Sequence, residues 1–131
     1  MFGKKKQPPI RSLVAPGTEI RGNLVFTDGL RVDGVIIGDV RSNEDSPSIL
    51  VVSESAHITG EIHADHVIIN GHVQGPVYAN DLLELQPKAR IEGDVHYKAL
   101  EMHQGAVISG QLRPMGLLED KPALKLAANN G

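Results

Sequence analysis

One short pattern recurs along most of this chain and restricts its fold more than any other feature. The pattern is apolar-x-Gly-x-apolar, where x is any residue. It occurs around Gly22, Gly38, Gly60, Gly75, Gly93 and Gly110. Successive glycines are 16, 22, 15, 18 and 17 residues apart. A recurring spacing of this size indicates a repeat architecture in which each copy is one structural unit.

Further columns appear when the copies are aligned on that glycine. Four residues before it stand only small residues, namely Thr18, Gly34, Ala56, Gly71, Ala89 and Ala106. About eight to ten residues after it stand pairs of apolar residues such as Leu30 with Val32 and Leu83 with Leu85. A unit this short cannot bury its own apolar face, so stacked units must align like residues into inner ladders. The sequence therefore predicts an all-β fold, a single-stranded right-handed β-helix of about six rungs.

The composition fits this prediction. Only 3% of the residues are aromatic, so the core must be aliphatic, and 14 glycines allow frequent corners between β-branched strands. The longest glycine spacing contains the polar stretch 41–48, which indicates a surface loop inserted into one rung. We expect the β-helix to span residues 14–115, flanked by flexible tails at 1–13 and 116–131.

Charge is distributed unevenly along the chain. Lys4, Lys5, Lys6 and Arg11 make the first 16 residues basic, whereas residues 17–113 hold seven Lys or Arg against fourteen Asp or Glu. An acidic body with few aromatic residues argues against binding to nucleic acid. Cysteine is absent and no apolar stretch is long enough to span a membrane, so we expect a cytoplasmic location.

The repeated rungs over residues 14–113, preceded by Met1, Phe2 and a lysine cluster, resemble the bactofilins, a family of bacterial cytoskeletal proteins. The resemblance implies assembly into non-polar filaments without nucleotide and a role in cell shape or in positioning cell-wall enzymes. It also implies peripheral attachment to the inner face of the cytoplasmic membrane through the N-terminal tail. The residues expected to bind the membrane are Met1, Phe2, Lys4, Lys5 and Lys6.

The two ends of a β-helix expose unpaired backbone groups and apolar side chains. No amphipathic capping helix is visible in the sequence, so we expect the ends to be polymerisation interfaces. The residues expected there are Val14, Ile20, Leu24 and Phe26 at one end and Val107, Ile108, Leu112 and Met115 at the other. Contacts between like ends would give a filament without polarity, and head-to-tail contacts a polar one. The sequence alone does not choose, and the resemblance favours the former.

The rung lengths and the glycine spacing bear on two alternative functions. An enzyme on a hexapeptide left-handed β-helix, such as an acyltransferase or a metalloenzyme, requires a six-residue period that these rung lengths break. No phosphate-binding loop is present, because the glycines recur at rung spacing rather than in one cluster. We therefore predict no catalytic activity and no cofactor. A non-polymeric module that presents its faces to a protein partner remains the alternative.

The histidines raise the question of a metal site. Two columns hold histidines, one with His57 and His72 and the other with His63 and His96 on either side of Tyr78. Residues in one column lie about 5 Å apart on adjacent rungs, but both columns should face outward without a third and fourth ligand. They are interpreted as surface histidines, and no metal is predicted. His63 and His66 are expected on opposite faces of one strand.

The C-terminal segment is also apolar in places. Leu117, Leu118, Leu124 and Leu126 are compatible with a short docking segment for a partner or with a frayed tail.

Overall fold

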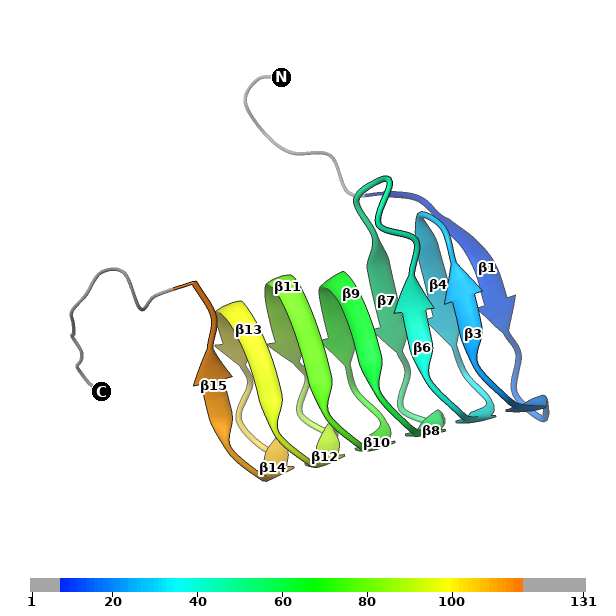
Figure 1. Ribbon diagram of the computed structural model, residues 1–131. Coiled ribbons are helices and arrows are strands. Elements are labelled where there is room, and N and C mark those ends of the chain that lie inside the picture. Colours follow the sequence, from blue (N-terminus) through cyan, green and yellow to red (C-terminus); the bar gives the residue numbers. More distant parts are fainter. Residues whose placement is uncertain (1–7, 117–131) are drawn as a thin grey trace.

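The computed structural model describes residues 8–116, which form a β-solenoid of about six turns. Figure 1 shows the turns stacked side by side along one axis. Strands pair only in parallel, and each residue pairs with its counterpart in the next turn. Within residues 8–116 there is no helix, and hence none that could cross a membrane. The predicted all-β repeat fold is confirmed.

Each turn has three faces. The first carries β1 (Ile10–Val14), β4 (Gly29–Val32) and β7 (Ile49–Val52), and the third carries β3 (Leu24–Phe26), β6 (Val40–Ser42) and β15 (Leu112–Pro114). The second carries β2 (Glu19–Arg21), β5 (Val35–Ile37), β8 (His57–Thr59), β10 (His72–Gln74), β12 (Arg90–Glu92) and β14 (Val107–Ser109). Three longer strands, β9 (Ile62–Ile69), β11 (Val77–Leu85) and β13 (Val95–Met102), pass from the third face onto the first.

Apart from Phe26, the buried apolar core is aliphatic, as the composition predicts. The apolar residue before each repeated glycine points inward, so Ile36, Ile58, Val73 and Ile91 form a ladder in which no side chain is more than 1% exposed. Parallel ladders run along the other two faces, for example Leu50, Val67 and Leu83. Stacking at about 4.8 Å per turn thus replaces water by a like residue above and below each core side chain.

The repeated glycine has a steric cause, shown best by Gly60. Its φ of +147° is one that side chains of L-residues rarely adopt. A Cβ atom at this position would also overlap the carbonyl oxygen of Gly38 in the preceding turn. The backbone of successive turns approaches so closely along this column that no side chain fits between them.

The corner before the second face has two forms. In four turns it is a β-turn, closed for example by the Ala56 N–H donating to the Ser53 carbonyl oxygen at 3.0 Å. In the other two turns the corner contains only Asp33 with Gly34, or Asn70 with Gly71, and a Cβ at Gly34 would overlap the Thr18 carbonyl oxygen below it. The column of small residues is therefore the point where each corner packs against the one before it.

The solenoid begins earlier than expected. Ile10, which the sequence analysis placed in the flexible tail, starts β1 and pairs with Gly29. Gly29 allows this because a Cβ there would lie only 2.9 Å from the Cα atom of Ile10. No alternating pattern precedes Val14, so this part of the strand could not be predicted from the sequence.

The inserted loop leaves the solenoid between β6 and β7, over residues 43–48 (Figure 1). Its last residue, Ser48, is 1% exposed and pairs with Asp65 on β9. The Ser48 N–H donates to Asp65 Oδ2 at 3.0 Å, and the Asp65 N–H donates to Ser48 Oγ at 3.0 Å. The turn therefore closes again with its register intact after the loop.

Candidate functional site

The N-terminal end of the solenoid exposes three strand edges. Among residues 8–116, β1, β2 and β3 each pair with a strand on one side only. An open hollow of about 710 Å³ lies between them, lined by Val14, Ile20, Leu24 and Phe26, the residues expected at this interface. Val14 and Phe26 are each 5% exposed, whereas Ile20 and Leu24 are half-buried. This end therefore presents an apolar floor framed by unpaired backbone.

The most exposed apolar residues at this end were not among those expected. Leu13 is 57% and Val25 is 69% exposed, and both have side chains on the outer side of their strands. The repeat could not single them out because outward positions carry no common residue type along the columns. Leu13, for instance, shares its column with Arg31 and Val51.

The C-terminal end has the same organisation. The second half of β13 and strands β14 and β15 have no further partner among the described residues. Val107 and Leu112 are 45% and 46% exposed, and Ile108 and Met115 are half-buried. Met102, an apolar residue of the repeat that was not among the expected interface residues, is 45% exposed at the end of β13. Each end thus carries apolar side chains next to open strand edges.

Side chains tie the last turn to the one before it. Asp94 accepts hydrogen bonds from the Gln111 N–H at 2.9 Å and from Arg113 Nε at 3.0 Å. The bond from the Gln111 N–H, followed by the one from Arg113, holds the pKa of the Asp94 carboxyl below its usual range. The same device recurs near the other end, where the Glu61 N–H donates to Asp39 Oδ1 at 2.9 Å. The acidic residues beside the repeated glycine therefore join successive turns.

The first histidine column lies on the second face. The rings of His57 and His72 are 4.4 Å apart, and His72 Nε2 lies 2.6 Å from a carboxylate oxygen of Glu92. This hydrogen bond is the main reason why the pKa of Glu92 is lowered, and Gln74 adds a second bond. His57 Nε2 contacts Gln74 at 2.9 Å. The two Nε2 atoms therefore belong to one hydrogen-bonded chain, which runs from His57 through Gln74 and Glu92 to His72.

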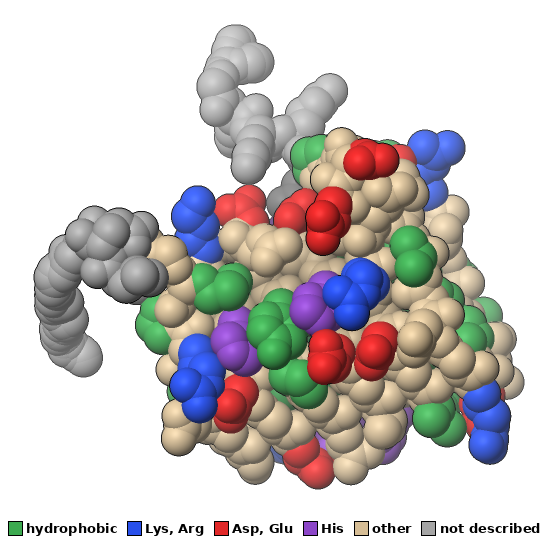
Figure 2. All heavy atoms as spheres, viewed as in Figure 1, with side chains coloured by type: hydrophobic (Ala, Val, Ile, Leu, Met, Phe, Trp, Pro, Cys, Tyr) green, Lys and Arg blue, Asp and Glu red, His purple; other side chains and the backbone are tan. Residues whose placement is uncertain are grey.

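The second histidine column lies on the third face. The Tyr78 ring stacks between His63, at 4.4 Å and 11°, and His96, at 4.2 Å and 14°. Figure 2 shows His side chains on either side of a hydrophobic one in the middle of this face, with acidic side chains below. His63 Nε2 pairs with Glu61 at 2.9 Å, and His96 Nδ1 contacts the Val77 carbonyl oxygen at 3.2 Å. Both columns are half-exposed, as predicted.

One expectation about the histidines is wrong. His63 and His66 do not lie on opposite faces of a flat strand, because β9 turns a corner between them and its burial pattern shifts phase there. Both side chains are half-buried, His63 on the third face and His66 on the first. Simple alternation fails wherever a strand bends onto the next face.

The predicted membrane-binding residues Met1, Phe2, Lys4, Lys5 and Lys6 lie outside the described residues, and so do Leu117, Leu118, Leu124 and Leu126.

The geometry defines a class of protein: a repeat scaffold that, within residues 8–116, carries most of its large exposed apolar side chains at its two ends. The family model described as "Bactofilin: Polymer-forming cytoskeletal" matches residues 12–113. The chain therefore belongs to the bactofilin family, which is structural and cytoskeletal. It is also similar to bactofilin BacO of Myxococcus xanthus, with 27% identity over 103 residues that cover 72% of this chain and 82% of the relative. No solved structure matches it.

Proposed function

We propose that this protein polymerises end to end, without nucleotide, into filaments that lie against the inner face of the cytoplasmic membrane. The filaments serve as a scaffold for cell shape or for cell-wall enzymes. The observation that carries the proposal is the state of the two ends, where open strand edges flank Leu13 and Val25 on one side and Val107 and Leu112 on the other. Membership of a polymer-forming family supports the same conclusion.

Stacking of a second copy on each end would cover its open strand edges and its exposed apolar side chains. Each edge presents unpaired N–H and C=O groups that a second copy can pair, and each apolar side chain removed from water adds a favourable contribution. Contacts between like ends would repeat the same surface on two copies and produce a filament without polarity. This arrangement is the one we propose. A non-polymeric scaffold that binds partners through its lateral faces is the alternative.

Assembly is tested by introducing a charge at each end. Leu112→Asp and Ile20→Lys should each convert protein that sediments as polymer into small species, because a charge buried between two ends is costly. The measurement is ultracentrifugal pelleting and electron microscopy, in EDTA and without nucleotide. The matched control is Thr59→Lys, which places the same charge at an exposed position on the second face, in a turn that has further turns on both sides.

The control should pellet like the parent protein, and all variants should keep a β-rich circular dichroism spectrum. End-to-end stacking is wrong if both end variants still pellet, and a strict need for ATP, GTP or a divalent ion would contradict assembly without nucleotide.

A further inference from the structure

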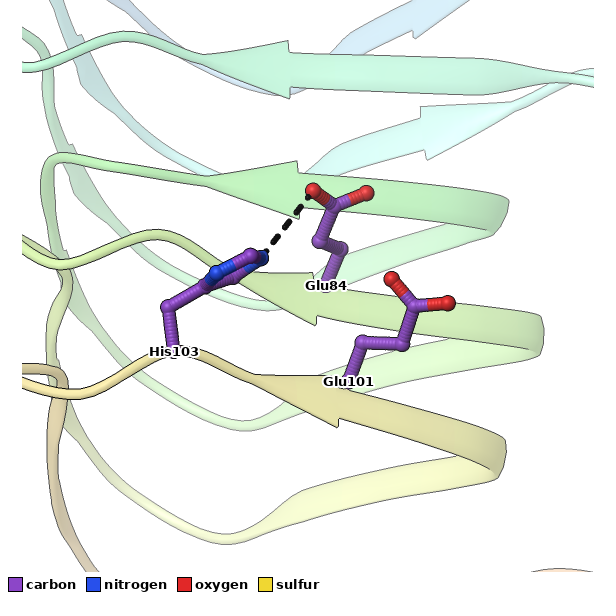
Figure 3. A group of neighbouring side chains, drawn as sticks. All are labelled: Glu84, Glu101 and His103. Atoms are coloured by element: carbon purple, nitrogen blue, oxygen red, sulfur yellow. Dashed lines mark ion pairs between the residues drawn. The ribbon is translucent and has the colours of Figure 1, made fainter.

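The last two turns bring together three potential metal ligands that the two histidine columns do not include. Glu84 on β11, Glu101 on β13 and His103 just after β13 each place one ligand atom within 4.8 Å of the others. His103 Nε2 lies 3.5 Å from Glu84 Oε2. Figure 3 shows the two carboxylates on adjacent strands, with the imidazole ring of His103 facing Glu84.

The backbone forces the two carboxylates to be neighbours. Glu84 and Glu101 are register partners in the parallel pairing of β11 with β13, so adjacent strands place them directly opposite each other. Like charges at such positions in a sheet are unfavourable. In the same column the preceding turns carry Ile68, Val51 and Arg31, so this is the column's one acidic pair among the described residues. A cation between the two carboxylates would remove the repulsion.

Two further residues help to hold the Glu84 carboxylate in place. Gln86 Nε2 donates to Glu84 Oε2 at 2.6 Å, and His66 Nε2 lies 4.0 Å from Glu84 Oε1. The Glu84 side chain is only 20% exposed, whereas the side chains of Glu92 and Glu61, which pair with single histidines, are 53% and 45% exposed. Neighbours that orient a ligating carboxylate are typical of metal sites.

We propose that Glu84, Glu101 and His103 bind one divalent transition-metal ion, with zinc the best match. An imidazole with two carboxylates suits zinc, which accepts nitrogen and oxygen donors in a four-coordinate site that water completes. Calcium and magnesium take all-oxygen ligand shells, so the His103 nitrogen favours zinc over either of them. The ion would join the last two turns near the C-terminal end. This binding is separate from the proposed assembly, which is expected in EDTA.

The test is calorimetric titration of the full-length, EDTA-stripped protein with zinc chloride. The parent protein should bind about one equivalent, and cobalt bound at the same site should give the visible absorption of a four-coordinate ion. His103→Ala and the isosteric Glu101→Gln should each weaken zinc binding by about tenfold or more. Both residues are exposed, so the variants should fold, and circular dichroism checks this.

His72→Ala is the matched control, because it removes an imidazole that faces one carboxylate, Glu92, without a second. It should leave zinc binding unchanged. The same titration in the Ile20→Lys background reads binding by small species that form no filament, so a failure of assembly does not affect it. The proposal is overturned if the parent protein binds no zinc, if His103→Ala and Glu101→Gln bind as the parent does, or if magnesium competes at equal concentration.

Discussion

At the scale of single residues, two separate causes require glycine at position 60: the backbone conformation and the close approach of the preceding turn. Alanine there would be strained by the φ of +147° and would also overlap the Gly38 carbonyl oxygen. Gly22 occupies the same column in the first turn, with a φ of +131°, but a Cβ there would meet nothing within 4 Å. The pair isolates the contact between turns from the backbone conformation.

We expect Gly60→Ala to lower the free energy of unfolding on the order of 3 kcal/mol or more, and Gly22→Ala by roughly 1–2 kcal/mol, the cost of the backbone strain alone. The measurement is chemical denaturation of both variants in the Leu112→Asp background, where no filaments are expected to form. Equal losses in the two variants would show that the close approach between turns contributes nothing.

The proposed metal-ligand cluster could not be predicted from the sequence, because its two glutamates do not align in the repeat. Glu84 lies nine residues after Gly75, whereas Glu101 lies eight residues after Gly93, so an alignment on glycine puts them in different columns. The structure corrects this offset at the corner of β11, where the register shifts between Ala79 and Leu82. The position of such a shift depends on how the corner packs, and the repeat pattern does not contain it.

At the scale of elements, the strands could be predicted where every turn needs an aliphatic residue at the same inward position. The inward columns around the repeated glycine accept only aliphatic residues, so their alignment alone identified the strands of the second face and the paired columns of the first. The corners could not be predicted in the same way. A two-residue corner such as Asp33 with Gly34 and a four-residue turn both deliver the next strand in register, so the sequence tolerates either.

The attachment of β15 should depend on pH. The folded-state pKa of Asp94 is lowered, so its bonds to Gln111 and Arg113 stabilise the last turn fully above the ordinary carboxyl pKa of about 4. This contribution is lost as the pH falls through the lower, folded-state value. In the Ile20→Lys background, Asp94→Ala should therefore lower the melting temperature at pH 7, and the difference from its parent should shrink below about pH 4. A difference that stays constant down to pH 2 would contradict this assignment.

At the scale of the whole molecule, membrane binding should depend on assembly. Three lysines near an anionic membrane contribute about 1 kcal/mol each, so one N-terminal segment binds weakly. A filament presents many such segments on one object, and avidity makes the attachment stable. The charge contrast supports this, because Lys4, Lys5 and Lys6 precede an acidic solenoid that anionic lipids would repel.

Deleting residues 2–6 should therefore abolish co-sedimentation with anionic liposomes while filaments persist. Leu112→Asp, with residues 2–6 intact, should also bind poorly because it lacks avidity. Raised salt should weaken binding of the parent protein by screening the lysine charges. If the deletion variant binds liposomes as well as the parent, another surface must contact the membrane.

The loop at residues 43–48 shows that this scaffold can accept extra residues at its periphery without a change in how its turns stack along the axis. The chain leaves the solenoid after β6 and rejoins it at Ser48, which forms two hydrogen bonds with Asp65. Ile36 before the loop and Ile58 after it are still register partners. The loop projects sideways from the stack rather than beyond its ends (Figure 1). An epitope or a fluorophore tag could therefore be inserted between Glu44 and Pro47. It would lie on the side of the polymer at regular intervals and away from the contacts between copies.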